Sequence, residues 1–486
     1  PASSQRAFYV DPDCAGGGDG SAGAPWTTLG MSATTPQWTA INEALAKGPV
    51  IVYFSAREAR ADTPEETTQP INVLRTDKSE NRLTLDGMSK YNTDDAHPAW
   101  ADYAGPCRLR VRIVGREWFA IGVKSDQLQY PTNDVTIRGF ETTGNAARVL
   151  FGGNRSTVER VYIHDIMMDG ANLMFHGSVE SDGTELFGRC NDITMRNNLI
   201  ERGQGEGIYV AGNYRRRSDG GWPEYGNTHS NILIEGNTIR DSGWNRGQGD
   251  GIDLKTGLQN VTVRGNVIER CHAEGAAGIT CDGVFGGVRS GYLVEGNRIS
   301  GAANGIEAGG QDGITIRNNV VCDNTSSGIS LSGDRVEGVV NREVEIYSNT
   351  IYGNEGLGIA IGGCDGAIVK NNLVFGNNSR WEAGSQMEIA DCTQVVTDHN
   401  LLSAPGSSWP EGPHSIIVTD DADWLTDTGS LVVGLARRDF HLGPQSPAVD
   451  KGADLSATGF WSDFEGVPRP QGQGWDIGAY EWKGMP

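Results

Sequence analysis

Cysteine, cationic side chains and long apolar runs are all scarce in this sequence. The chain has 486 residues but 8 cysteines, too few for a disulfide scaffold, and no CxxC pair that would indicate a zinc ribbon or redox motif. No window approaches about 18 consecutive apolar residues, so no membrane span is predicted, and no cationic-then-apolar signal peptide is expected at the start. Lys and Arg number 40 against 62 Asp and Glu, and the net charge of −22 argues against a nucleic-acid partner. We expect a mature, secreted monomer.

Glycine, in contrast, is abundant. The chain has 68 glycines, which is about twice the usual share. Glycine is unfavourable inside helices and suited to tight turns, so this composition argues against a helical protein. The sequence therefore predicts an all-β protein built from short strands and turns.

One phrase of alternating apolar and polar residues, followed by a polar turn with asparagine, returns along the chain. Its period of two indicates strands. The copies are DVTIRGF (134–140), DITMRNNLI (192–200), NILIEGNTI (231–239), NVTVRGNVI (260–268), GYLVEGNRI (291–299), GITIRNNVV (313–321), EVEIYSNTI (343–351) and GAIVKNNLV (366–374). The shortest asparagine spacing, 22 residues from Asn297 to Asn319, is that of one rung of a parallel β-helix. We expect the stacked asparagines to hydrogen-bond from rung to rung.

A second phrase, GIYV at 207–210 and its later copies, completes each rung. Its second and fourth residues are candidates for the core, and its third is expected to face outward. Rungs lie about 4.8 Å apart, so equivalent outward positions form columns on the surface. The repeats predict a single-stranded right-handed parallel β-helix.

The two ends differ from the repeat. Residues 36–47 place apolar side chains at helical spacing and predict a short N-terminal capping helix. We expect a cap with the first rungs over 1–105, the β-helix over 106–403 and an irregular C-terminal tail packing on it over 404–486. Two cysteines in equivalent places of neighbouring rungs, Cys364 and Cys392, are candidates for a disulfide, whereas a third, Cys281, faces inward.

The phrase GQGEGIYV at 203–210 returns as GQGDGIDL at 247–254 and brings carboxylates together. Glu206 and Asp250 become neighbours in one column, and Asp253 lies three residues further on. Carboxylates this close repel unless they are protonated or share a cation, and calcium prefers such oxygen ligands. These three residues therefore make a candidate calcium site. The alternative is that they are corner carboxylates that accept backbone hydrogen bonds.

Further ionisable groups gather on the same face. The outward column through Asp253 also contains Tyr209 and Glu307, and the next column contains His176, Lys255 and Asp282. We take Asp253, Lys255, Tyr209 and Glu307 as candidate catalytic residues and His176 and Asp282 as substrate contacts. For Lys255 the alternative is a salt-bridged surface lysine.

Two insertions on the same rungs carry aromatic and cationic side chains. Aromatic rings can stack on sugar faces, and arginines can pair with carboxylates or sulfates. The candidate substrate-binding residues there are Arg215, Arg216, Arg217, Trp222, Tyr225 and Trp244. The alternative is a solvated loop without a ligand.

These patterns resemble a known family. The repeated ITIRNN…GIxL phrase, the FYVDP start at 8–12 and the SPAVDKGA…DIGAYEW ending are similar to right-handed parallel β-helix proteins of the pectate-lyase-like superfamily. The stretch GDGIDLK at 249–255 is similar to the aspartate-rich calcium motif of family nine pectate lyases. That resemblance implies Asp250 and Asp253 as metal ligands. The fold itself hosts lyases, hydrolases, epimerases and adhesins.

Three functions remain open. The first is a lyase that cleaves a uronate-containing polysaccharide by β-elimination, with Lys255 as base or charge neutraliser, Tyr209 as proton donor and Ca²⁺ on Glu206, Asp250 and Asp253. The second is a glycoside hydrolase with two carboxylates, such as Asp253 and Glu307, on the same face. The third is a carbohydrate-binding or adhesive solenoid without catalysis.

Overall fold

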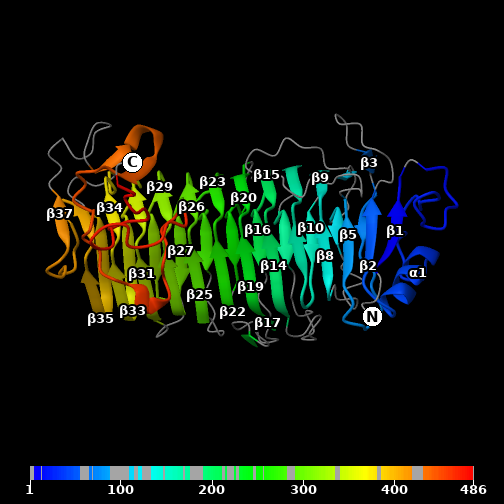
Figure 1. Cartoon of the computed structure of the whole chain (residues 1–486), viewed down its shortest axis with the longest axis horizontal. Helices are drawn as coiled ribbons and strands as arrows, with labels where there is room; N and C mark the ends of the chain where they lie inside the picture. Colours follow the sequence, from blue (N-terminus) through cyan, green and yellow to red (C-terminus); the bar gives the residue numbers. More distant parts are fainter. Residues whose placement is uncertain are drawn as a thin grey trace. The chain divides into compact units, whose positions relative to one another are not determined.

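The computed structural model divides the chain into two compact units, residues 1–258 and 259–486. It describes the following residues: 5–12, 14–54, 65–67, 69–87, 109–113, 119–122, 133–145, 148–167, 170–175, 190–210, 214–215, 224–225, 229–244, 248–255, 257–281, 290–333, 340–379, 385–404, 406–418 and 431–484. Both units are built almost entirely of parallel strands (Figure 1). In the described part of the chain, no helix has the length and apolar character needed to cross a membrane.

In residues 1–258, parallel strands stack in three series. The first series is β1 (Arg6–Val10), β2 (Val50–Phe54), β5 (Leu83–Asp86), β8 (Val135–Arg138), β11 (Thr157–Glu159), β14 (Asn191–Arg196) and β19 (His229–Glu235). The second is β4 (Ile71–Asn72), β7 (Ile121–Gly122), β10 (Val149–Phe151), β13 (Leu173–Phe175), β16 (Ile208–Val210) and β21 (Ile252–Leu254). The third is β3 (Glu65–Thr67), β6 (Leu109–Ile113), β9 (Phe140–Gly144), β12 (Tyr162–Ile166), β15 (Leu199–Gly203) and β20 (Thr238–Ser242). A short hairpin pairs β17 (Tyr214–Arg215) with β18 (Glu224–Tyr225).

Residues 259–486 repeat the three series. The first is β22 (Leu258–Arg264), β25 (Ser290–Glu295), β28 (Asp312–Arg317) and β31 (Asn341–Tyr347), and the second is β24 (Ile279–Cys281), β27 (Ile306–Gly309) and β30 (Ile329–Ser332). Two long strands, β33 (Ile359–Lys370) and β35 (Met387–Asp398), run through both. The third is β23 (Val267–Cys271), β26 (Arg298–Ser300), β29 (Val320–Cys322), β32 (Thr350–Tyr352), β34 (Leu373–Phe375), β36 (Leu401–Ser403) and β37 (Ile416–Val418). This rung architecture confirms the predicted parallel β-helix.

A ladder of buried asparagines lines one bend, as the repeat predicts. The Asn319 amide donates to Asn349 Oδ1 (3.0 Å) and to the Val294 carbonyl (2.9 Å), and its own Oδ1 accepts from the Asn297 amide (3.0 Å). The residue before each ladder asparagine takes a left-handed conformation, for example Asn318 at φ 54°. A second ladder, from Asn324 through Asn354 to Asn377, was not predicted from the sequence.

Replacing Asn319 by leucine should lower the free energy of unfolding by about 3 kcal/mol, because it leaves several buried polar groups without a partner. Thermal or urea unfolding measures the loss. The partner change Asn349→Leu and the double variant complete a cycle, and we expect the double loss to be smaller than the sum of the single losses. Strict additivity would show that the ladder does not act as a connected network.

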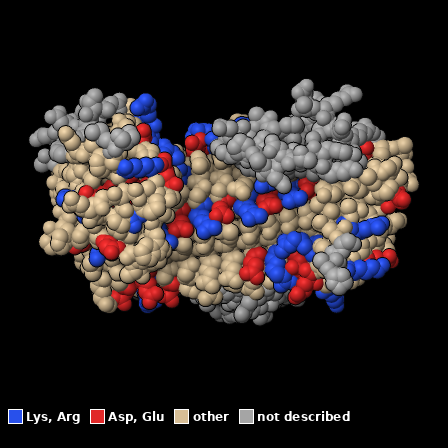
Figure 2. Space-filling view, in the orientation of Figure 1, with Lys and Arg blue, Asp and Glu red and all other residues tan. Residues whose placement is uncertain are grey.

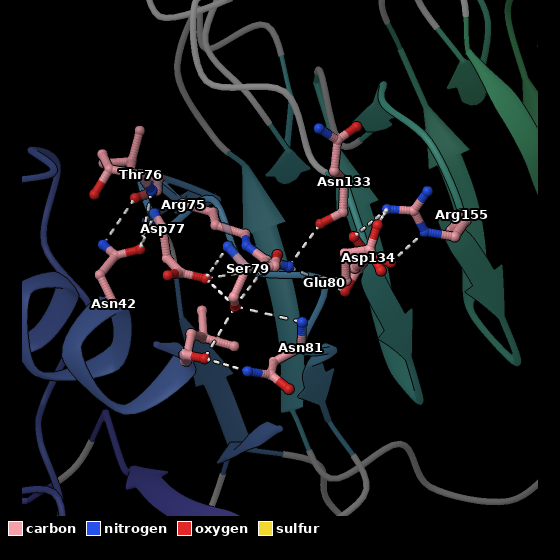
Figure 3. A network of polar contacts seen from close by, with 12 residues as sticks. Asn42, Arg75, Thr76, Asp77, Ser79, Glu80, Asn81, Asn133, Asp134 and Arg155 are labelled. Carbon is pink, nitrogen blue, oxygen red and sulfur yellow. Dashed lines mark hydrogen bonds and ion pairs between the residues drawn. The ribbon is translucent and has the colours of Figure 1, made fainter. Parts of the chain in front are cut away.

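The predicted capping helix is present as α1 (Pro36–Leu45), with Trp38, Ile41 and Leu45 buried. Asn42 on this helix accepts hydrogen bonds from the backbone of Thr76 (2.9 Å) and Asp77 (3.1 Å). Figure 3 shows this network and its extension through Arg75, which donates to the Asn133 carbonyl (2.7 Å). Polar contacts thus attach the helix to the segment that precedes β5.

The C-terminal segment 431–484 packs on the third series of residues 259–486. It contains β38 (Val432–Gly434), β39 (Asp439–Leu442) and two short 3₁₀ helices (Leu435–Arg437 and Ser456–Thr458). Phe440, Ile477 and Tyr480 share an apolar cluster with Leu373 and Phe375 of β34. Hydrophobic burial therefore holds this segment against the rungs.

Three cysteines can be compared with the sequence analysis. Cys364 and Cys392 are paired in register on neighbouring strands, as predicted, but both are free thiols and no disulfide joins them. The Cys392 thiol instead donates to the Ala390 carbonyl (3.1 Å). Cys281 is fully buried, which confirms its inward orientation.

Candidate functional site

The strand register in residues 1–258 places Tyr209 directly opposite Asp253, as the aligned repeats predict. Tyr209 is the middle residue of β16 and Asp253 the middle residue of β21, while Met174 of β13 lies on the other side of Tyr209. Ile208 and Ile252 beside them are fully buried. The alternation of strand side chains therefore puts the apolar residues in the core and Tyr209 and Asp253 in one outer column.

Asp253 lies in the outer column as predicted, but its side chain is only 1% exposed. The Lys255 ammonium lies 2.8 Å from Asp253 Oδ2, and Lys255 itself is 30% exposed. The same ammonium lies 5.7 Å from the centroid of the Tyr209 ring. A buried carboxylate needs such a charged partner, so Lys255 turns back toward the column and contributes to the burial of Asp253.

Glu206 and Arg148 add a second pair of opposite charges to this cluster. Glu206 is 2% exposed and Arg148 is 6% exposed. Burial raises the pKa of Glu206 and the Asp253 charge raises it further, while Lys255 and Arg148 act in the opposite direction. The cluster thus combines two cations with two buried carboxyl groups, and the pKa of Glu206 is raised mainly by its burial.

Arg148 was missed by the sequence analysis. It precedes Val149 of β10 as Gly207 precedes Ile208 of β16, so an arginine stands at a position that is glycine in most later rungs. This break in the repeat is the signal that marks it. A Cβ on Gly170 would lie 3.1 Å from the Arg148 guanidinium, so the absent side chain there leaves room for this arginine.

The glycines around Glu206 are required by close approach of the rungs. A Cβ on Gly205 would lie 2.4 Å from the backbone of Gly170, and a Cβ on Gly207 would lie 2.6 Å from the carbonyl oxygen of Gly251. Any side chain at these positions would force the backbones apart. The glycine pattern GQGEGI therefore lets Glu206 lie between closely spaced backbones.

The structure places the other predicted residues as follows. Asp250 is half-buried, and its carbonyl accepts from Gly207 N (2.9 Å), which puts it on the rung next to Glu206. Glu307 belongs to residues 259–486, where it pairs in register with Thr280 and accepts a hydrogen bond from Asn304 (2.9 Å). Trp244 follows β20 and is exposed. Arg215 and Tyr225 lie on the hairpin strands β17 and β18, and the residues outside the described part are His176, Arg216, Arg217, Trp222 and Asp282.

Calcium was predicted on Glu206, Asp250 and Asp253. The Lys255 ammonium lies 2.8 Å from Asp253 Oδ2, one of the two oxygens that this carboxylate offers. In the described ranges, the side chains close enough together to share one ion are Asp398, His399 and His414, which belong to residues 259–486. The three carboxylates do not converge here as a calcium site requires. No step below depends on calcium, and its binding stays a prediction that a titration would test.

Charged side chains of opposite sign are paired elsewhere on the rungs as well. Arg138 lies 2.7 Å from Asp86, Arg155 lies 2.7 Å from Asp134, and further pairs follow the same pattern. On the face drawn in Figure 2, basic and acidic side chains lie next to one another. Asp86 and Asp134 in these pairs are buried as well, so the cluster around Asp253 is distinguished by its second buried carboxyl group, Glu206.

Comparisons with known proteins agree on the fold. A family model described as a right-handed β-helix region matches residues 225–342 and 277–433. No curated protein matches the chain. Among solved structures, XylC in complex with xylose aligns with 98% of this chain and 98% of its own, at 10% identity and a TM-score of 0.56. The GH136 lacto-N-biosidase from Eubacterium ramulus aligns with 85% of this chain and 67% of its own, at 14% identity and a TM-score of 0.48. The pectate lyase Pel9A aligns with 99% of this chain and 97% of its own, at 15% identity and a TM-score of 0.42. At such identities the likeness shows the fold alone.

Proposed function

Since the chain is a right-handed parallel β-helix, we propose that it belongs to the pectate-lyase-like superfamily and is a secreted lyase that cleaves a uronate-containing polysaccharide at Lys255 and Tyr209. One observation carries the proposal: the ammonium of Lys255 is held 2.8 Å from buried Asp253 and 5.7 Å from the ring of Tyr209. XylC, which shares the fold, was solved in complex with xylose, and this complex supports a sugar as the ligand of the chain.

Exposure decides which groups contact the substrate. Lys255 and Tyr209 are partly exposed, whereas Asp253 and Glu206 are buried. A polymer that lies along the rungs would therefore contact Lys255 and Tyr209 first. An ammonium has three donors, so Lys255 keeps its contact with Asp253 while it binds a uronate carboxylate. Asp253 acts as a positioning residue.

β-Elimination requires neutralisation of the uronate carboxylate, removal of the proton on the adjacent carbon and protonation of the leaving oxygen. Lys255 supplies the positive charge. The oxygen of Tyr209, as phenolate, takes the proton from the carbon, and the electron pair forms a carbon–carbon double bond as the glycosidic carbon–oxygen bond breaks. The same Tyr209 oxygen returns the proton to the leaving oxygen, so the enzyme ends the cycle unchanged.

A glycoside hydrolase is the second candidate, and the raised pKa of Glu206 favours it. A protonated Glu206 beside an ionised Asp253 would provide the acid and the carboxylate that hydrolysis needs. Both groups are buried, however, so a sugar chain would reach them only after a rearrangement. Accessibility therefore places hydrolysis second.

Incubation with a panel of uronate and neutral polysaccharides tests the proposal. We expect unsaturated products with ultraviolet absorbance from at least one uronate polymer, and the absorbance should persist in the presence of a chelator because no step requires calcium. Saturated reducing ends without absorbance would favour hydrolysis. Binding without any product would favour the adhesive solenoid. Activity that disappears on chelation and returns with calcium would restore the calcium prediction.

A further inference from the structure

A group of two histidines and one aspartate lies near the C-terminal end of the rungs in residues 259–486. Asp398 ends β35, His399 follows it at the bend, and His414 lies in the segment 409–415 that precedes β37. These residues lie outside the candidate site in residues 1–258. Their chemistry is therefore independent of the proposed lyase activity.

His399 occupies the left-handed bend position of its rung, with φ 55°. Other rungs fill this position with asparagine, glycine or serine, as at Asn318, Ser348 and Asn371. The bend therefore does not require an imidazole. The fold tolerates asparagine at this position, which makes His399→Asn a substitution that respects the backbone.

The three side chains converge on one carboxylate oxygen. Asp398 Oδ2 lies 3.1 Å from His399 Nδ1 and 2.9 Å from His414 Nδ1. The two imidazole rings are stacked, with centroids 4.5 Å apart and planes 22° apart. One ligand atom from each of the three residues lies within 4.8 Å of the others. In tetrahedral zinc sites the ligand atoms are about 3.4 Å apart, so only small shifts of these three side chains are needed.

Hydrogen bonding accounts for the contact of His414 with Asp398 but not for that of His399. His414 donates from its backbone to Asp398 Oδ1 (3.0 Å), and its ring nitrogen lies within hydrogen-bond distance of Oδ2. His399 Nδ1 is buried and lies 3.1 Å from Oδ2, but it makes no hydrogen bond in the described part of the chain. An unpaired buried nitrogen beside a carboxylate costs free energy, which coordination of a shared cation would offset.

We propose that Asp398, His399 and His414 bind a divalent transition-metal ion of the zinc class. Two imidazole nitrogens and one carboxylate oxygen suit zinc and related ions, whereas calcium and magnesium prefer oxygen ligands alone. Three protein ligands leave a further position for water. The ion fastens segment 409–415 to the end of β35.

The backbone already holds this segment in place. Gly412 N donates to the Thr397 carbonyl (2.8 Å), and the Thr397 hydroxyl donates to the Pro410 carbonyl (2.8 Å). His414 is 61% exposed, so the site is open to an ion from solvent. The ligands are thus largely preorganised, and binding needs little rearrangement of the chain.

Titration calorimetry of the full chain with Zn²⁺ tests the proposal. We expect one equivalent to bind, and His399→Asn or His414→Ala to weaken that binding by about ten-fold or more. The matched control is His441→Ala, which removes an imidazole that also contacts two carboxylates, Asp439 and Glu465. The His441→Ala variant should still bind one equivalent of Zn²⁺ with the affinity of the parent. Ca²⁺ and Mg²⁺ should not compete at equal concentration.

Thermal unfolding gives a second measurement. Zn²⁺ should raise the melting temperature of the parent and the His441→Ala variant but not of the His399→Asn variant, because only a folded site binds the ion. Circular dichroism without metal checks that the variants are folded. Absence of Zn²⁺ binding by the parent, or binding that survives both ligand changes, would overturn the proposal.

Discussion

Replacing Lys255 by alanine should reduce kcat/KM on a uronate polysaccharide by about a hundred-fold or more, because it removes the cation that neutralises the substrate carboxylate. Lys255 is 30% exposed and contacts Asp253 and the ring of Tyr209, so its loss changes the charge at the site more than the packing of the rung. The initial rate of ultraviolet absorbance gives the measurement.

The matched control is Lys451→Ala, which removes an exposed lysine of the C-terminal segment and should leave the rate unchanged. Lys255→Arg separates charge from geometry. It keeps the positive charge but places it in a planar group, so we expect an intermediate rate. Full activity of Lys255→Ala would remove Lys255 from the mechanism, whereas equal losses in Lys255→Ala and Lys451→Ala would point to a general effect of net charge.

The backbone was largely predictable because each rung repeats the same sequence pattern. A period of two sets which side chains face the core, and the spacing of Asn297, Asn319 and Asn349 sets which residues stack. The predicted opposition of Tyr209 and Asp253 followed from that register alone. Because the strands of successive rungs pair in a regular register, residues at equivalent positions of the repeat become neighbours in space.

The candidate site was less predictable because side-chain direction and burial depend on contacts between rungs. Alternation placed Asp253 in an outer column but could not indicate that Lys255 would turn back onto it. Arg148 was not predicted because it lies in an early rung whose sequence matches the repeat poorly. His399 was not predicted because it lies beyond the last repeat copy recognised in the sequence, at 366–374.

Arg469 in the C-terminal segment offers the largest expected effect on stability. Its side chain is fully buried, and Nη1 lies 2.7 Å from Glu481 Oε1, which is buried as well. Its Nη2 donates to the Gly478 carbonyl (2.9 Å) and to Asn318 Oδ1 (3.2 Å), so it also connects the segment to the bend of a rung. Burial raises the pKa of nearby Asp476 to about 6, which indicates how poorly this environment solvates charge.

Arg469→Met should therefore lower the free energy of unfolding by about 3–5 kcal/mol, because it leaves the Glu481 carboxylate buried without its partner. The double variant Arg469→Met, Glu481→Gln should recover part of this loss, since it removes the uncompensated charge. Arg437→Met, at an exposed position of the same segment, should change the free energy by no more than about 0.5 kcal/mol. The urea midpoint of each variant gives the comparison. Equal midpoints for Arg469→Met and Arg437→Met would mean that the buried pair does not stabilise the segment, and a double variant less stable than Arg469→Met would mean that the cost comes from lost hydrogen bonds and not from unpaired charge.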